Sequence, residues 1–172
     1  MQGITRRDWL LASGCWAELL QAQSGSQPLR YFDPATAAEV EAVAETILPA
    51  DGTPGARETG VIRFIDGALA GYDQDKRGAY TEGLADLQTR RARLFPGSAT
   101  IAGLASEQRE VLLKSIEKTE FFRMLRLHTI LGFFGNPKHG GNRDFAGTKL
   151  LNVETSTDFT PPFGFYDREE NR

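Results

Sequence analysis

Leu131-Gly-Phe-Phe-Gly-Asn-Pro-Lys-His-Gly-Gly-Asn-Arg-Asp-Phe-Ala-Gly147 decides the fold, because this stretch is entered from an apolar run and holds five glycines, a proline and two asparagines. Asn136-Pro137 stops the helix that precedes it. Gly140 and Gly141 can adopt backbone angles closed to other residues, and Asn142 can bond neighbouring amides in place of regular structure. The pattern predicts a loop held in one conformation, with at least one of the two adjacent glycines at positive φ.

The apolar run before the loop predicts a helix from about Phe121 to Phe134. Its apolar residues are Phe121, Phe122, Met124, Leu125, Leu127, Ile130, Leu131, Phe133 and Phe134. A helix that is apolar on nearly every side must be buried on nearly every side. It is therefore either the central helix of a bundle or a helix that docks one face on another protein.

Four more helices are expected upstream, each bounded by capping or turn residues. The first begins at Asp33-Pro34 and ends at Pro49, and the second runs from Val61 to near Gly71. The third starts at Asp73 or Asp75 and ends at Pro96-Gly97. The fourth is capped by Ser106 and buries Val111, Leu112 and Ile116. No segment alternates apolar and polar residues as a strand would. The sequence predicts a single all-α bundle of about five helices with one long glycine-rich structured loop and an irregular C-terminal tail.

Length and composition allow one domain. The 172 residues, 40% of them hydrophobic, can bury one core, and we divide them into a signal segment and linker at 1–28 and a helical domain at 29–172. The net charge of −3 argues against nucleic-acid binding, which needs a basic face. Cys15 is the only cysteine, which excludes an internal disulfide, a Cys-x-x-Cys-His haem attachment and an iron–sulfur cluster.

Motifs of the common enzyme classes are absent. No Gly-x-Gly-x-x-Gly follows a strand pattern, and the stretch from Gly141 to Lys149 misses the spacing of a phosphate loop. His128 and His139 are the only histidines, and neither has a second ligand at helical spacing. The serines form no Gly-x-Ser-x-Gly elbow. The residues therefore indicate a chain without a catalytic, cofactor or metal site of its own.

The N-terminus has the pattern of an export signal. Thr5-Arg6-Arg7-Asp8-Trp9-Leu10-Leu11 matches the Ser/Thr-Arg-Arg-x-Phe-Leu pattern of twin-arginine signals. The apolar stretch from Trp9 to Leu20 is far shorter than the roughly 18 residues of a membrane span. The residues that carry the signal are Arg6, Arg7, Trp9 and Leu10. Two alternatives stay open, an amphipathic N-terminal helix and a lipid anchor at Cys15.

The glycine-rich stretch resembles the small-subunit family named after gluconate 2-dehydrogenase subunit 3. The resemblance rests on Gly132-Phe-Phe-Gly-Asn-Pro, on His139-Gly-Gly-Asn and on Gly147, and it extends over roughly residues 38 to 152. Other matching segments are Thr46-Ile-Leu-Pro-Ala-Asp51, Pro54-Gly-Ala-Arg-Glu-Thr-Gly-Val61, Phe64-Ile-Asp66 and Glu120-Phe-Phe-Arg-Met-Leu-Arg126. One departure is Thr148, where the family usually has tryptophan.

The resemblance implies an accessory protein. Proteins of this family are small subunits of membrane-associated, flavin-dependent sugar or sugar-acid dehydrogenases, and they accompany a large FAD subunit and often a cytochrome c subunit. The resemblance further implies that the small subunit supplies the export signal for its signal-less partner and assists its maturation. We therefore expect a non-catalytic chain with no cofactor, carried by the twin-arginine translocase to the periplasm and held by its complex at the outer face of the inner membrane.

The expected partner surface centres on the loop. Its candidate residues are Phe133, Phe134, Asn136, Pro137, His139, Gly140, Gly141, Asn142 and Gly147, with the aromatic tail from Phe159 to Tyr166 as a further candidate. Bracing of the loop, and cover over the protein's own core, are the structural alternatives. Two other functional classes stay open: a lipid-anchored structural protein through Cys15, and a free-standing secreted helical enzyme or ligand-binding protein that uses His139, Asn142, Arg143 and Asp144.

Overall fold

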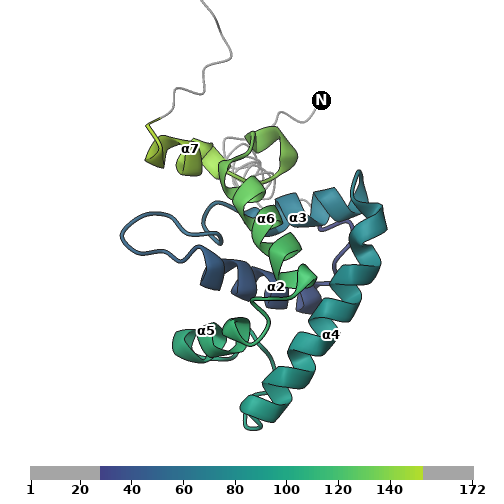
Figure 1. The fold of residues 1–172 in the computed structure, drawn as a ribbon. Coiled ribbons are helices and arrows are strands. Elements are labelled where there is room, and N and C mark those ends of the chain that lie inside the picture. The colour runs from purple at the N-terminus through teal and green to yellow at the C-terminus, as the bar shows by residue number, and fades with distance from the viewer. Residues whose placement is uncertain (1–27, 153–172) are drawn as a thin grey trace, which may run out of the picture.

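The computed structural model describes residues 28–152 and confirms an all-α architecture over that range. Its elements are α2 (Pro34–Ile47), α3 (Val61–Ala70), η1 (Gln74–Lys76), α4 (Arg77–Leu94), α5 (Ser106–Lys114), α6 (Glu120–Phe134), η2 (Pro137–His139), η3 (Arg143–Phe145) and α7 (Ala146–Leu150), where η marks a 3-10 helix. The five expected helices correspond to α2 through α6 (Figure 1). None of the described helices has the length and apolar character needed to cross a bilayer. The predicted signal residues Arg6, Arg7, Trp9 and Leu10, Cys15, and the aromatic tail lie outside the described residues.

Helix α6 runs through the middle of the bundle. It packs chiefly against α3 and also contacts α2, α4 and α7 (Figure 1). Thr119 caps its start, because the side-chain oxygen accepts a hydrogen bond from the N–H of Phe122 at 3.2 Å. Gly132 lets α3 come close, since a Cβ at this position would lie 3.0 Å from the Cβ of Phe64. The buried face of α6 consists of Leu125, His128, Thr129, Gly132 and Phe133.

The opposite side of α6 carries apolar side chains that the described residues leave uncovered. Leu127 is 54% exposed and Leu131 is 44% exposed, while Ile130 and Phe134 are partly exposed. Their spacing places all four on one face of the helix, which we call the outer stripe. Helix α6 is therefore the central helix of the bundle, and docking of its outer stripe on another protein stays a prediction.

Helix α5 corrects the sequence prediction at its start. Ala105, and not Ser106, is the N-cap residue with an extended backbone. The side chain of Gln108 accepts a hydrogen bond from the Ala105 N–H at 3.0 Å, so the third helical position reaches back to the cap. Ser106 consequently becomes the first residue of the helix instead of its cap.

The buried stripe of α5 also differs from the prediction. Leu112 and Leu113 are buried, whereas Val111 is 50% exposed and Ile116 is buried in the turn after the helix has ended. The side chain of Arg109 fixes this rotation, because it donates hydrogen bonds to the Thr46 hydroxyl on α2 at 3.1 Å and to the carbonyl of Leu104 at 2.6 Å. The prediction that Val111 is buried was therefore wrong.

A buried carboxylate anchors the beginning of the described chain. Asp66 on α3 is 3% exposed and accepts hydrogen bonds from the backbone N–H groups of Arg30, Tyr31 and Phe32 at 2.7, 2.9 and 2.9 Å. The next residue, Asp33, caps α2 through its side chain, as the sequence predicts. The chain is therefore held to α3 immediately before it enters its first helix.

A chain of buried polar side chains joins α4, α6 and η1. The Tyr80 hydroxyl lies 2.9 Å from Nδ1 of His128, and Nε2 of His128 lies 3.3 Å from a carboxylate oxygen of Asp73. The other oxygen of Asp73 accepts a hydrogen bond from Lys76. Since a carboxylate can only accept from the Nε2–H of His128, Nδ1 is unprotonated and accepts from Tyr80. Asp73 therefore serves this cluster and does not begin α4, which starts at Arg77 after η1.

This cluster predicts a pH-dependent stability. Burial lowers the pKa of His128, so between its folded-state pKa and about 6.5 the unfolded chain binds the proton and the folded chain does not. The free energy of unfolding should consequently fall as the pH drops below about 6.5. Urea denaturation of wild type and His128→Gln at pH 7.5 and 5.5 measures this, and the wild type should lose more stability than the variant. His139→Gln, at an exposed histidine, is the control and should behave as wild type; an equal loss in all three proteins contradicts the prediction.

Candidate functional site: the loop at the end of helix α6

The glycine-rich loop folds back over the C-terminal end of α6. After Gly135 it makes η2 and η3 and then enters α7, so it lies at one end of the bundle, at the top of Figure 1. Its η2 contacts α3, and the N–H of Arg143 donates to the carbonyl of Thr59, just before α3, at 3.0 Å. The loop therefore joins α6 to the residues that lead into α3.

Asn142 closes the loop from inside. It is fully buried, and its side-chain Nδ2 donates to the carbonyl of Gly135 at 2.7 Å while its Oδ1 accepts from the N–H of Gly147 at 2.8 Å. Nδ2 also lies 3.5 Å from the hydroxyl of Thr148, which in turn donates to the carbonyl of Phe145 at 3.1 Å. One amide thus ties the beginning of the loop to its end. Thr148 joins the same hydrogen-bond network.

Three glycines let the loop backbone lie directly on the helices. Gly140 has a φ of +102°, which confirms the expectation for the adjacent glycine pair. A Cβ at Gly141 would come within 3.0 Å of the carbonyl oxygen of Gly132, and a Cβ at Gly147 would come within 3.0 Å of the carbonyl oxygen of Phe133. Any larger residue at the last two positions would have to push the loop away from α6.

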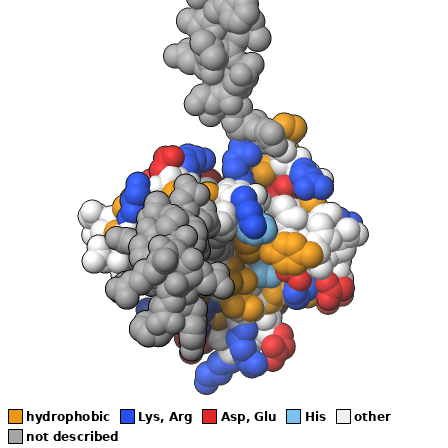
Figure 2. Space-filling model, turned by 90° about the horizontal axis from the view of Figure 1, so that it is seen from above, with side chains coloured by type: hydrophobic (Ala, Val, Ile, Leu, Met, Phe, Trp, Pro, Cys, Tyr) orange, Lys and Arg blue, Asp and Glu red, His pale blue; other side chains and the backbone are white. Residues whose placement is uncertain are grey.

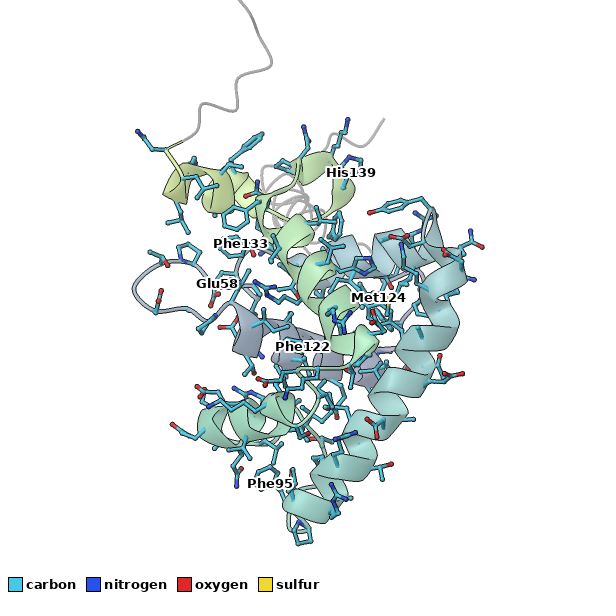
Figure 3. The ribbon with its side chains drawn as sticks, viewed as in Figure 1. Glu58, Phe95, Phe122, Met124, Phe133 and His139 are labelled. Carbon is cyan, nitrogen blue, oxygen red and sulfur yellow. The ribbon has the colours of Figure 1, made fainter. Side chains whose placement is uncertain are left out.

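The structure divides the predicted partner residues into two groups. Phe133, Gly141, Asn142 and Gly147 are buried within the chain, and Phe133 lies between α6 and α7 (Figure 3). The residues at the surface, fully or in part, are Phe134, Asn136, Pro137, His139 and Gly140. The first group can affect a partner only through the shape of the loop. Only the second group can touch a partner, and its binding stays a prediction.

The sequence interpretation left one feature of the surface around the loop unassigned and missed another. The first is the outer stripe of α6, which leads directly into the loop through Phe134. The second is a set of exposed cations, Lys138, Arg143 and Lys149, none of which forms an ion pair with another described residue. Figure 2 looks down on this end of the bundle and shows Lys and Arg side chains around apolar and histidine side chains. The face is therefore apolar along α6 and cationic at the loop.

The polar residues of the loop do not converge on a shared ligand position. Asn142 uses both ends of its amide inside the loop, and His128 belongs to the buried cluster with Tyr80 and Asp73. His139 is exposed at the end of η2 (Figure 3). Among the described residues, no group of three or more His, Cys, Asp or Glu side chains could hold a metal ion.

Comparison with known proteins identifies a family. The family model described as gluconate 2-dehydrogenase subunit 3 matches residues 34–153, which include the loop, α2 through α7 and the residue after Asn152. This confirms the resemblance seen at residues 38 to 152. No curated protein and no solved structure matches the chain.

The contact between the loop and α6 predicts a cost for a single methyl group. Gly141→Ala should reduce the free energy of unfolding by about 1 to 3 kcal/mol, because the new Cβ collides with the carbonyl oxygen of Gly132 and the loop must move. Gly97→Ala is the matched control, since a Cβ at Gly97 has no neighbour within 4 Å. Urea denaturation followed by circular dichroism measures both. Equal stability of the two variants would show that the loop is free to move away from α6.

Proposed function

Because this chain belongs to the gluconate 2-dehydrogenase subunit 3 family, we propose that it is the non-catalytic small subunit of a flavin-dependent sugar or sugar-acid dehydrogenase. The large subunit of that complex binds FAD and carries out the oxidation, and a cytochrome c subunit accepts the electrons. The small subunit contributes a docking surface, the export signal and help in maturation. Its own residues hold no cofactor.

The observation that carries this proposal is the loop. Asn142, Gly141 and Gly147 are buried to fix the loop in one shape, although the polar residues around them do not converge on a ligand. A rigid surface loses little conformational entropy when a partner binds, so it suits a lasting interface. We assign the docking surface to the outer stripe of α6 and to the exposed loop residues from Asn136 to Gly140. A permanent pair would bury roughly 2,000 Å² or more.

Export follows from the chemistry of the cofactor and the pattern at the N-terminus. FAD is available in the cytoplasm, and a holoenzyme that has folded around it cannot thread a channel for unfolded chains. The twin-arginine translocase carries folded proteins, so one signal at Arg6 and Arg7 is enough for a preassembled pair. The complex then resides in the periplasm at the outer face of the inner membrane.

The docking assignment predicts the effect of one charge on α6. Leu131→Glu should leave the helical circular dichroism near that of wild type, because the side chain is 44% exposed. It should weaken copurification of the FAD subunit by about 10-fold or more, because it places a charge in an apolar contact. Leu94→Glu is the matched control, since Leu94 is 41% exposed at the end of α4. Full recovery of the flavoprotein with Leu131→Glu would place the interface elsewhere.

The export assignment predicts that the two subunits reach the periplasm together or not at all. Replacement of Arg6-Arg7 by Lys-Lys should keep both this protein and the FAD subunit in the cytoplasm, because the guanidinium groups and not the charge are the export determinant. Arg93→Lys, at an exposed arginine of α4, is the control and should leave export intact. Immunoblots of periplasmic and cytoplasmic fractions, with dehydrogenase activity in each, give the result. Normal delivery of both proteins by the Arg6-Arg7 variant rules out the signal, and loss of this chain alone rules out its shared use.

A further inference from the structure

A groove opens between the end of α2, helix α5 and the start of α6, on a part of the molecule that the docking surface does not use. It has a volume of about 500 Å³. Its apolar floor is formed by Ile47, Leu113 and Phe122, and Phe122 points from α6 toward α5 (Figure 3). The groove is therefore an apolar hollow large enough for one or two aromatic side chains.

The rim of the groove is charged, with a cationic excess. Lys114 lies 4.0 Å from Glu110 and pairs with it. Glu117, Lys118 and Arg126 complete the charged rim, and neither Lys118 nor Arg126 forms an ion pair with another described residue. An occupant that combines aromatic side chains with carboxylates would match both the floor and the rim.

The chain carries such a segment beyond the described residues. Residues 153–172 contain five acidic and two basic side chains, so they account for the whole net charge of −3, and the remainder of the sequence is balanced. The segment Asp158-Phe-Thr-Pro-Pro-Phe-Gly-Phe-Tyr-Asp167 places four aromatic residues between two aspartates. We propose that residues 158–167 occupy the groove in the free subunit, with aromatic rings on Phe122 and Leu113 and carboxylates beside Lys118 and Arg126.

The reach of the chain permits this contact. Phe159 follows Asn152 by seven residues, which span up to about 25 Å when extended. Gly147 lies against the carbonyl of Phe133, from which α6 rises about 17 Å to Phe122, and α7 adds about 8 Å before the chain reaches Asn152. The path is therefore about 25 Å, which the residues from Phe159 onward can span. Tethering also raises the effective concentration of the segment to the millimolar range, so that a weak match is enough for occupancy. The two prolines reduce the entropy lost on docking.

Disulfide formation in the full chain tests the proposal. In a Cys15→Ser background, Glu117→Cys at the groove is combined with Thr160→Cys in the tail, and oxidation under mild conditions is followed on non-reducing gels. Thr89→Cys on α4, an exposed position that does not line the groove, combined with Thr160→Cys is the control. We expect an intramolecular disulfide that forms at least about 10-fold faster with the groove position than with the control.

A charge reversal tests the cations separately. Adding Lys118→Glu and Arg126→Glu to the groove pair should slow the disulfide several-fold, whereas adding Lys138→Glu on the loop should not. Equal rates at positions 117 and 89, or no effect of the charge reversal, overturns the proposal. A disulfide that forms only between two chains assigns the tail to a second copy, and one that forms only with the FAD subunit assigns it to that partner; either result also overturns the proposal. Each readout is made on the isolated subunit first, so it does not depend on whether the dehydrogenase assignment holds.

Discussion

The close approach of the loop backbone to α6 is the constraint on which the rest of this structure depends. Gly141 and Gly147 lie against the carbonyl oxygens of Gly132 and Phe133, at distances that leave no room for a side chain. Asn142 then holds the two ends of the loop together from the buried side. The contacts of Gly141 and Gly147 join the backbone of the loop to the backbone of α6. They therefore fix the position of the loop relative to the helix axis as well as its shape.

The same helix is fixed from its other side by Gly132 and by the buried polar cluster. The absence of a Cβ at Gly132 brings Phe64 of α3 into contact, and His128 connects α6 to Tyr80 of α4 and to Asp73. Several independent contacts therefore hold one face of α6 in the protein interior. The outer stripe lies on the opposite face, and it is exposed because these contacts fix the rotation of the helix.

Much of this could be predicted from the sequence, and the parts that could not have physical reasons. Local sequence signals predict the start of α2 and the end of α4. These signals are Asp33-Pro34 and Pro96-Gly97, and each acts within one helical turn. The rotation of α5 depends on a hydrogen bond from Arg109 to Thr46, 63 residues away, and no local pattern contains it. The loop residues were recognisable by type, but whether Gly141 is exposed or pressed on Gly132 is decided by tertiary contact. Four of the residues expected at a partner surface, Phe133, Gly141, Asn142 and Gly147, thus proved to be buried within the chain. The exposed side of α6 could not be chosen until its buried side was known.

The anchor at Asp66 has a mechanical meaning. Among the described residues, a pull applied ahead of Arg30 would first load the N–H groups of Arg30, Tyr31 and Phe32, which all donate to one buried carboxylate. The load is shared among these bonds and passed into the middle of α3, instead of peeling α2 from its first turn. Tension along the chain would therefore be resisted at the Asp66 carboxylate before it reached the first turn of α2.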